Sequence, residues 1–142
     1  MSDCLHGSWI ATALNSALTS AKLKLWTSGT ANSDAQYMSD VDGSELGTTG
    51  YTAGFAGTAL ALTGVSATYN ATTNKIELTG TAGTLSAIGM PAGVEITLAR
   101  IYIPGTSYAD SKVVATLACA KTLYGSDFTI TLDAVGIGTI AV

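Results

Sequence analysis

Apolar and polar residues alternate in two neighbouring stretches near the middle of the chain. The first stretch runs from Leu60 to Tyr69 and the second from Lys75 to Leu78. Residues 70–74, NATTN, separate them. A period of two residues that is interrupted by an Asn- and Thr-rich cluster is typical of a half-buried β-hairpin. The hairpin contains one carboxylate and no Cys or His, so we interpret it as a structural element rather than as a catalytic site.

Shorter alternating stretches recur along the rest of the chain, with Gly, Pro and Asn between them. They predict further strands at 22–26, 84–88, 95–103, 112–119, 127–132 and 134–142. Seven or eight short strands at roughly ten-residue spacing are typical of a β-sandwich or a jelly roll. The alternation predicts these buried positions: Leu23, Leu25, Leu60, Leu62, Tyr69, Ile76, Leu78, Ile101, Ile103, Val114, Phe128, Ile130 and Leu132.

The N-terminal segment has a helical period instead. Over 9–18 the apolar residues at helical spacing are Ile10, Ala13, Leu14, Ala17 and Leu18, and Ser8 is the candidate N-cap. A helical turn over 35–39 and an acidic turn over 40–45 are expected further on. We therefore expect a single all-β domain over 1–142, with an N-terminal arm and short helix over 1–20 and an antiparallel β-sandwich over 21–142.

Composition adds that the surface carries little charge. Of the 142 residues 47% are hydrophobic and only 11% are charged, whereas roughly a quarter are charged in an average soluble domain. Ser, Thr, Gly and Ala fill the difference. A neutral, hydroxyl-rich surface does little to keep a protein monomeric, and it suits a protein whose surface is in contact with other proteins. An ordinary all-β domain with a Thr-rich face is the alternative.

The distribution of charge excludes several classes of partner. The net charge is −4 and the six Lys and Arg residues are scattered, so we expect no binding to nucleic acid. No apolar run reaches 18 residues, so no membrane span is expected. The first residues lack the order of a signal peptide, which favours assembly in a cytoplasm. Cys4 and Cys119 are expected to be free thiols there, although a disulfide between them stays open.

The residues that carry chemistry are few and dispersed. His6 is the only histidine and has no sequence neighbour that would orient it, so no catalytic triad or zinc site is expected. The segment around Asp40, Asp42 and Glu45 faintly resembles a calcium loop, but a solvated turn is favoured. We expect no catalytic residue, no metal and no cofactor. Three further carboxylates read as turn formers: Asp110, Asp127 and Asp133. The aromatic residues are dispersed and read mainly as packing residues: Trp9, Trp26, Tyr51, Tyr69, Tyr102, Tyr108 and Tyr124.

The predicted short helix is followed by a strand, KLKL at 22–25, and by an acidic loop, SDVD at 39–42. The motifs that follow are GYTAG at 50–54, LTG at 62–64, TYNATTNKI at 68–76, LARIYI at 98–103 and GSDFTITLD at 125–133. These elements and motifs in this order resemble a family of small structural proteins of tailed-phage virions, among them head decoration proteins. The chain departs from the family at Pro104, where a charged turn is usual, and in an insertion over 87–93.

The resemblance implies a non-enzymatic decoration or cement protein on the outside of a phage capsid. Its partner would be the major capsid protein, whose subunits it would bridge. The alternative is a structural protein of the tail or a fibre, with binding of a host receptor or glycan as its role, and a small hydrolase with a carboxylate cleft is a third.

The setting of such a family also implies a homo-oligomer, with a trimer favoured because capsid lattices offer three-fold positions. Both ends of the chain carry more apolar residues than short terminal segments need for their own folding. The expected interface residues are Leu5, Trp9, Ile10, Ile137, Ile140 and Val142. The alternative is that both ends simply pack on the core of the domain.

Overall fold

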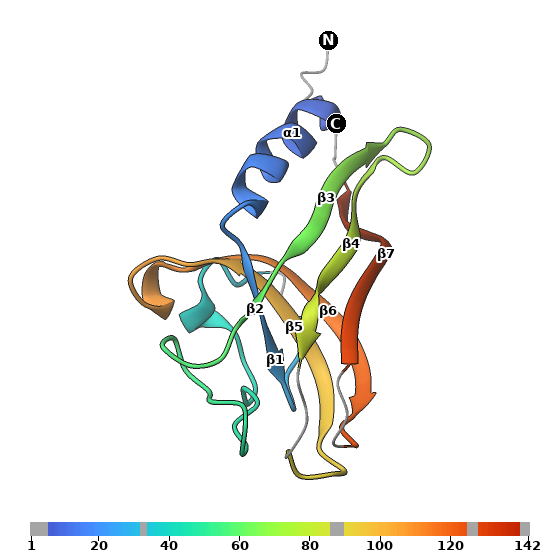
Figure 1. Ribbon diagram of the computed structural model, residues 1–142. Coiled ribbons are helices and arrows are strands. Elements are labelled where there is room, and N and C mark those ends of the chain that lie inside the picture. Colours follow the sequence, from blue (N-terminus) through green and yellow to red (C-terminus); the bar gives the residue numbers. More distant parts are fainter. Residues whose placement is uncertain (1–5, 32–33, 86–89, 125–127, 140–142) are drawn as a thin grey trace.

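The computed structural model of the chain contains two antiparallel sheets and one helix (Figure 1). It describes residues 6–31, 34–85, 90–124 and 128–139, and the backbone alone for 81–85 and 128–139. The elements are α1 (Gly7–Leu18), β1 (Lys22–Trp26), the 3₁₀ turn η1 (Met38–Asp40), β2 (Leu60–Ala61), β3 (Thr63–Asn70), β4 (Lys75–Leu85), β5 (Glu95–Ile103), the 3₁₀ turn η2 (Tyr108–Asp110), β6 (Lys112–Thr122) and β7 (Phe128–Thr139). The expected all-β fold with a short N-terminal helix is confirmed.

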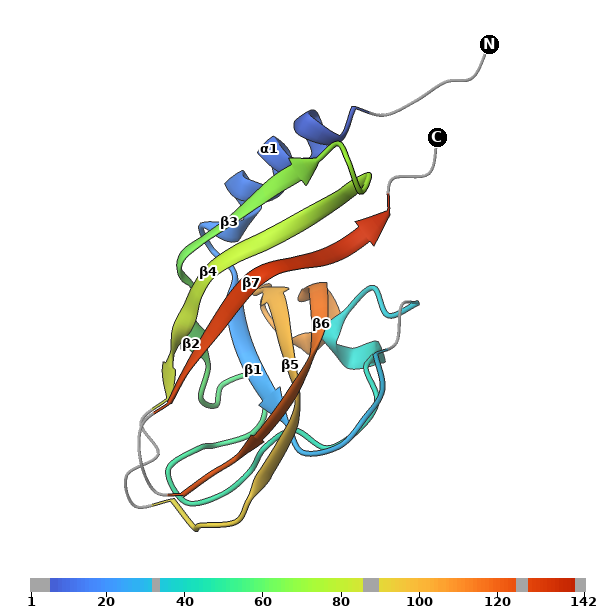
Figure 2. The same ribbon diagram turned by 90° about the vertical axis from the view of Figure 1, so that its right-hand side faces the viewer.

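The strands divide into a four-stranded sheet with the order β2-β1-β5-β6 and a three-stranded sheet with the order β3-β4-β7. The chain passes from one sheet to the other at Leu62, between β2 and β3. All strand pairs are antiparallel. Figure 2 shows α1, β3, β4 and β7 side by side in that order, so that the helix lies along one edge of the three-stranded sheet.

The predicted hairpin is confirmed for β3 and β4, with Tyr69 opposite Ile76. Its first strand begins at Thr63 rather than Leu60, because Leu60–Ala61 form β2 and pair with β1 in the other sheet. Its turn is stabilised by the Asn70 side chain, which accepts hydrogen bonds from the backbone amides of Thr72 and Thr73. Asn74 closes the turn with a φ of 55°, a conformation that asparagine tolerates better than most residues. The NATTN segment therefore forms a turn for local reasons that the sequence alone contains.

Two strand predictions need correction. The strands expected at 127–132 and 134–142 form one strand, β7, so Asp133 lies within a strand and does not form a turn. The strand expected at 84–88 is the end of β4, which reaches Leu85, and the positions after it lie outside the described residues. The turn expected over 35–39 is the 3₁₀ turn η1, which begins at Met38.

The helix begins earlier than expected, and its predicted apolar stripe faces inward except at one position. Its N-cap is His6 rather than Ser8, and no side chain caps it. Leu18 is buried, Ile10, Leu14 and Ala17 are partly buried, and Ala13 is exposed. Gly7 and Ala11, which the stripe did not include, are also buried. Contact with β3 sets the orientation of the helix, and this contact is not visible in the local sequence pattern.

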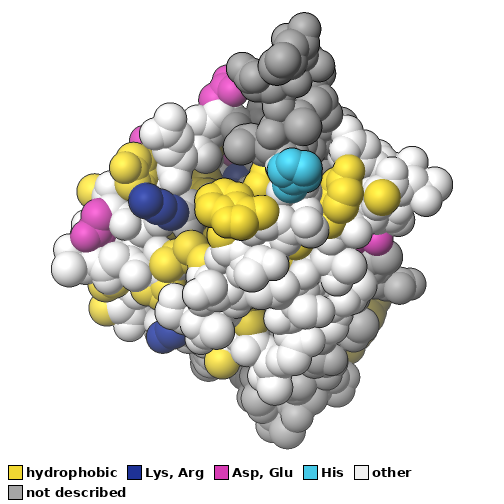
Figure 3. Space-filling view, turned by 90° about the horizontal axis from the view of Figure 1, so that it is seen from above, with side chains coloured by type: hydrophobic (Ala, Val, Ile, Leu, Met, Phe, Trp, Pro, Cys, Tyr) yellow, Lys and Arg dark blue, Asp and Glu magenta, His cyan; other side chains and the backbone are white. Residues whose placement is uncertain are grey.

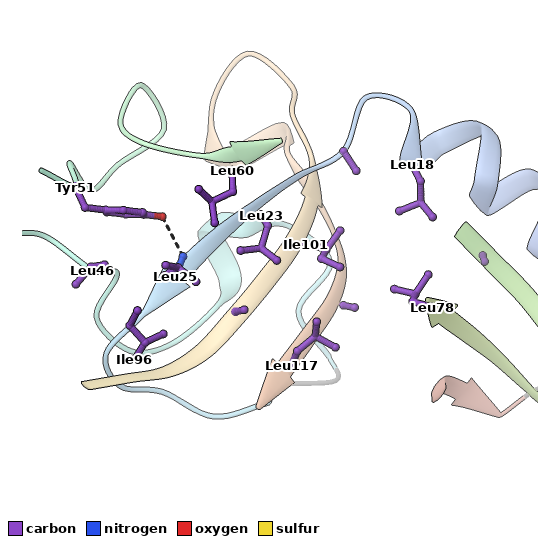
Figure 4. Close-up of a cluster of buried hydrophobic side chains, with 14 of the residues drawn as sticks. Leu18, Leu23, Leu25, Leu46, Tyr51, Leu60, Leu78, Ile96, Ile101 and Leu117 are labelled. Atoms are coloured by element: carbon purple, nitrogen blue, oxygen red, sulfur yellow. Dashed lines mark hydrogen bonds between the residues drawn. The ribbon is translucent and has the colours of Figure 1, made fainter. Parts of the chain in front are cut away.

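One hydrophobic cluster joins the two sheets and the helix (Figure 4). Six of the predicted core residues are buried in it: Leu23, Leu25, Leu60, Ile76, Leu78 and Ile101. Four others are partly buried and pack against it: Leu62, Tyr69, Ile103 and Val114. The side chains of Phe128, Ile130 and Leu132 lie outside the described residues. Leu46 and Tyr51 join the cluster from the long loop between β1 and β2, and the Tyr51 hydroxyl accepts a hydrogen bond from the Leu25 amide (Figure 4).

The four-stranded sheet is buried on both faces, which the alternation in β1 did not predict. One face contributes Leu23 and Leu25 to the shared cluster. The other face carries Lys24 and Trp26, and both of these side chains are also buried. The loops before β2 and before β6 cover this second face, where Trp26 belongs to a smaller apolar cluster. Lys24 therefore does not reach solvent, although it alternates with leucine as a surface residue would.

Candidate interaction surface

The helix α1 is held against the edge strand β3 by one asparagine. The Asn15 side chain donates a hydrogen bond of 2.7 Å to the carbonyl of Ala67 and accepts one of 2.6 Å from the amide of the same residue. This pair of bonds copies the contacts of a neighbouring strand and occupies the edge of β3 at that position. Near the start of the helix, Gly7 lies so close to the ring of Tyr69 that a β-carbon would come within 2.2 Å of it.

With this inner side fixed, the helix presents an outer face of five exposed residues. They are Ser8, Trp9, Thr12, Ala13 and Ser16, and we call them the outer face of α1. None of them is charged, and the helix as a whole carries no charged residue. The Trp9 side chain is 68% exposed. Figure 3, seen from this end of the molecule, shows large hydrophobic side chains on either side of the histidine, with a basic side chain at the edge of this area.

Hydroxyl groups on the helix turn back onto its own backbone. The Thr12 hydroxyl donates to the carbonyl of Ser8 at 2.9 Å, and the Thr19 hydroxyl donates to the carbonyl of Ser16 at 2.8 Å. Such bonds leave the Thr methyl groups free to point outward. The outer face is therefore less polar than its composition suggests, and its largest side chain is an exposed tryptophan.

The expected interface residues fall into three groups. Trp9 is exposed as an interface residue should be, whereas Ile10 is partly buried and packs against the core of its own chain. Ile137 lies in β7, for which the backbone alone is described. Leu5, Ile140 and Val142 lie outside the described residues. Trp9 is therefore the member of the set that the described residues show to be exposed.

A second feature, which the sequence did not predict, is a pair of buried cations beneath the loops. Lys24 and Arg100 are direct cross-strand neighbours in β1 and β5, and the side chains of both are 0% exposed. Two like charges in this position destabilise a sheet unless each has its own counter-charge. We call these two residues, with Asp42 and Glu45, the cation cluster.

Arg100 is held by the loop that contains Asp42. Its guanidinium donates to the Asp42 carbonyl at 3.0 Å, to the Thr30 carbonyl at 2.9 Å and to the Asp42 carboxylate at 3.2 Å. It also stacks over the ring of Trp26, 4.6 Å from the centroid. Burial lowers the pKa of Arg100, and the carboxylate opposes this shift. Hydrogen bonds from Thr30, with a smaller contribution from Arg100, lower the pKa of Asp42.

Lys24 is held by Glu45 and by the loop over residues 46–59. Its ammonium lies 3.1 Å from a Glu45 oxygen and also donates to the Gly54 carbonyl. The other Glu45 oxygen accepts from the Gly54 amide at 3.0 Å and from the Tyr108 hydroxyl at 2.7 Å. Burial and the bond to Glu45 raise the pKa of Tyr108, so this hydroxyl stays protonated as a donor. Each charge and each donor of this network has a partner.

The cation cluster corrects the interpretation of the acidic segment. Asp42 and Glu45 form neither a calcium loop nor a merely solvated turn, because each binds one of the buried cations. Within the described ranges, no three His, Cys, Asp or Glu side chains gather where they would hold a metal ion. Every buried side-chain nitrogen or oxygen atom in the same ranges has a hydrogen-bond partner. The cluster therefore acts as a clamp that holds the loops around Asp42 and Gly54.

The remaining candidates for chemistry are isolated. His6 is exposed at the N-cap of α1. Asp110 forms the turn expected of it, accepting hydrogen bonds from Thr106 and Ser107 that lower its pKa to about 2. Cys119 is a half-buried free thiol whose pKa burial raises, and Cys4 lies outside the described residues. A shallow hollow of about 420 Å³ is lined by Ala35, Gln36, Tyr37, Lys112 and Val113, with Lys112 as its one charged side chain.

The aromatic residues largely confirm the packing interpretation. Trp26, Tyr51 and Tyr102 are buried, and Tyr108 packs edge-on against Tyr102. Besides Trp9, the exception is Tyr124, which is 75% exposed at the end of the described segment after β6. No sequence signal marks which aromatic residues are buried, because the loops that cover them come from distant parts of the chain.

None of the helices described here has the length and hydropathy to span a membrane. Comparison with models of known protein families, with curated protein sequences and with solved structures gives no match to this chain. A function for this chain is therefore inferred from its residues, namely the loops held by the cation cluster and the uncharged, exposed outer face of α1.

Proposed function

We propose that the chain is a non-enzymatic structural protein of a phage virion, which decorates the capsid and binds across neighbouring subunits of the major capsid protein. The observation that carries this proposal is the outer face of α1, an uncharged surface with Trp9 68% exposed. The order of motifs from residue 22 to residue 133 supports the choice of partner. The contact is passive, so it requires a surface of suitable shape and polarity but no reactive group.

An uncharged surface favours a permanent contact for energetic reasons. Charged groups lose their hydration when they are buried at an interface, and this cost often exceeds the gain from pairing them. Interface cores are accordingly poor in charge and rich in aromatic residues such as tryptophan. The outer face of α1 shares the absence of charge and contributes one exposed tryptophan. The two buried cations, Lys24 and Arg100, are already paired with carboxylates of the same chain.

The cation cluster supports the same role by fixing the loops before binding. Loops that become ordered only on binding lose conformational entropy, which weakens the contact. Here Arg100 holds the segment around Asp42, and Lys24 holds the segment around Gly54. The surface formed by these loops is therefore set before any partner arrives.

The consequence for the particle follows from linkage. A protein that binds the assembled shell but not the separated subunits stabilises the shell by RT ln(1 + [L]/Kd), which is about 2.7 kcal/mol per site at a free concentration of 100 Kd. Many such sites together raise the temperature at which the shell opens. The protein would act in the virion, after assembly in the host cytoplasm.

The test compares virions that carry the protein with virions from a deletion strain. We expect deletion to lower the temperature and the osmotic shock at which particles release DNA, and we expect purified protein to restore both. Protein carrying Trp9→Ala should restore less than the unchanged protein, whereas Tyr124→Ala, at the other exposed aromatic residue, serves as the control. Identical stability with and without the protein contradicts the cement role. Immunogold label on the tail rather than the head would favour the alternative of a tail or fibre protein that binds a host receptor or glycan.

A further inference from the structure

The four-stranded sheet is extended at one edge by a short piece of the chain's own loop. β6 is the outer strand of this sheet, and residues 36–38 lie antiparallel along its start, where Figure 2 shows η1 beside β6. The Met38 amide donates to the Ser111 carbonyl at 2.8 Å, and the Val113 amide donates to the Gln36 carbonyl at 3.1 Å. The outer side of β6 is therefore able to pair with an extended backbone, and at its start it already does.

This pairing stops at Val113, and the edge beyond it is open. Over residues 114–122, β6 pairs with β5 on its inner side, and no described residue forms a backbone hydrogen bond with its outer side. The register with β5 is regular over 115–118, between two bulges, so the stretch that is straight enough for a further strand is short. Ala118 and Ala120 are exposed there and are too small to obstruct a neighbour. An unpaired edge of this kind is a template for an added strand.

The arrangement determines which end of an added strand comes to Val113. A strand that is antiparallel to β6, as residues 36–38 are, runs from the side of Ala118 toward Val113. Its C-terminal end then meets residues 36–38, which occupy the edge from that point on. The added segment must end there or leave the sheet. The site therefore favours the C-terminus of a chain over the middle of one.

The hollow of about 420 Å³ lies at this meeting point. It is lined by Ala35, Gln36, Tyr37, Lys112 and Val113, so it opens where residues 36–38 leave β6. Lys112 is its one charged side chain and is exposed. A lysine ammonium forms charge-assisted hydrogen bonds with a carboxylate. The terminal carboxylate of an antiparallel strand reaches the same place, and the two charges are complementary.

We propose that the open edge of β6 binds the extended C-terminal tail of a partner protein, which adds to the sheet as an antiparallel strand with its terminal carboxylate beside Lys112. The tail pairs with residues 114–118 through its backbone, which supplies most of the affinity in this mode of recognition. A contact this short buries less than about 1,200 Å² and is typical of weak, transient binding. The site lies on a different element from the outer face of α1 and does not rest on the capsid role.

The first test titrates the ¹⁵N-labelled full chain with a synthetic peptide and follows the backbone amides by NMR. The probe is KKTVTVTV with an acetylated N-terminus and a free C-terminus, because pairing through the backbone depends little on the side chains. We expect saturable shifts centred on residues 113–118. Two further probes carry N-methyl groups on alternate amides in the two possible patterns, and the pattern that faces β6 should abolish binding. No saturable shift at millimolar peptide, shifts centred elsewhere, or equal binding of both methylated probes would overturn the proposal.

The second test measures whether Lys112 reads the carboxylate. Amidation of the peptide's C-terminus and Lys112→Gln should each weaken binding about threefold, as expected for an exposed ion pair. The two changes together should weaken it no further, because they remove the same contact. Lys75→Gln, at an exposed lysine of the other sheet, is the matched control and should have no effect. Equal binding of the acid and the amide, or an equal effect of Lys112→Gln on both, would refute the role of the carboxylate.

The third test determines the direction of the added strand with a nitroxide label at the N-terminus of the peptide. The label should broaden the amide signals near Ala118 more than those near Val113. The opposite pattern indicates a parallel strand, whose carboxylate would lie far from Lys112, and refutes the proposal. All three tests use the isolated protein, so they can fail without affecting the proposed capsid role, and the reverse also holds.

Discussion

Removal of Glu45 is the perturbation that tests the cation cluster most sharply. The Lys24 side chain is 0% exposed and its carboxylate partner is only 10% exposed. Glu45→Ala therefore leaves a buried cation with the Gly54 carbonyl as its hydrogen-bond partner and the Tyr108 ring 5.6 Å away. Removing one partner of a buried ion pair costs about 3–5 kcal/mol. For a domain of this size each kcal/mol lowers Tm by roughly 2–5 °C, so we expect Tm to fall by about 6 °C or more.

The double replacement Lys24→Met with Glu45→Gln should be much milder. Methionine fills the space of the lysine stem without a charge, and the glutamine carbonyl still accepts from the Gly54 amide and the Tyr108 hydroxyl. The glutamine amide can donate to the Gly54 carbonyl, which the lysine has left. Replacing a whole buried pair by groups of similar volume is often close to neutral, so we expect the double variant to lose less than about 1.5 kcal/mol.

The assay is urea unfolding followed by circular dichroism, with Glu95→Ala as the matched control because Glu95 is an exposed carboxylate. Surface substitutions of this kind change the free energy of unfolding by about 0.5 kcal/mol at most. The reasoning is refuted if Glu45→Ala behaves like Glu95→Ala, or if the double variant is less stable than Glu45→Ala. Either result would mean that the pair is not the clamp that the geometry indicates.

Three further predictions concern the helix and an acidic turn. Gly7→Ala, which strengthens most helices, should here lower the free energy of unfolding by about 1–3 kcal/mol, because the new methyl group meets the ring of Tyr69. A Tm of this variant equal to or above that of the unchanged protein would contradict the docking of α1. Asn15→Ala removes the side chain that bonds the amide and the carbonyl of Ala67, so we expect the free energy of unfolding to fall by about 1–3 kcal/mol. We also expect faster thioflavin-positive aggregation through the freed strand edge, and an unchanged aggregation rate would show that the edge is protected by other means. Hydrogen bonds lower the pKa of Asp110 from 3.8 to about 2 in the folded protein, so its stabilising contribution is complete above pH 3.8 and is lost as the pH falls toward 2. Asp110→Asn should therefore flatten the decline of Tm over this pH range, and an unaltered profile of Tm against pH would argue against the hydrogen-bonded turn.

The sequence predicted those parts of the fold that depend on near neighbours. The hairpin over β3 and β4 follows from alternation and from the turn-forming Asn70 and Asn74, which act within a few residues. The strands β1 and β5 were placed for the same reason. Asp133 misled the prediction, because a carboxylate between two apolar runs is typical of a turn and yet lies inside β7.

The features that depend on distant contacts were not predictable. Lys24 and Glu45 are separated by 21 positions, and Arg100 and Asp42 by 58, so no local pattern links them. The one available signal was the low charge content, which makes each Lys or Arg within a strand worth examining as a buried group. On α1 the predicted apolar stripe was wrong at Ala13, which is exposed, and the contact that Asn15 makes with β3 involves a polar residue, which no apolar pattern indicates.

The central claim is that this chain decorates a phage capsid, and a cryo-EM map of the virion tests it most directly. The account predicts density of this two-sheet fold on the outer surface of the shell, bridging neighbouring subunits of the major capsid protein, with the outer face of α1 buried in a contact. Density of the fold in the tail, or a complete particle without it, would contradict the account.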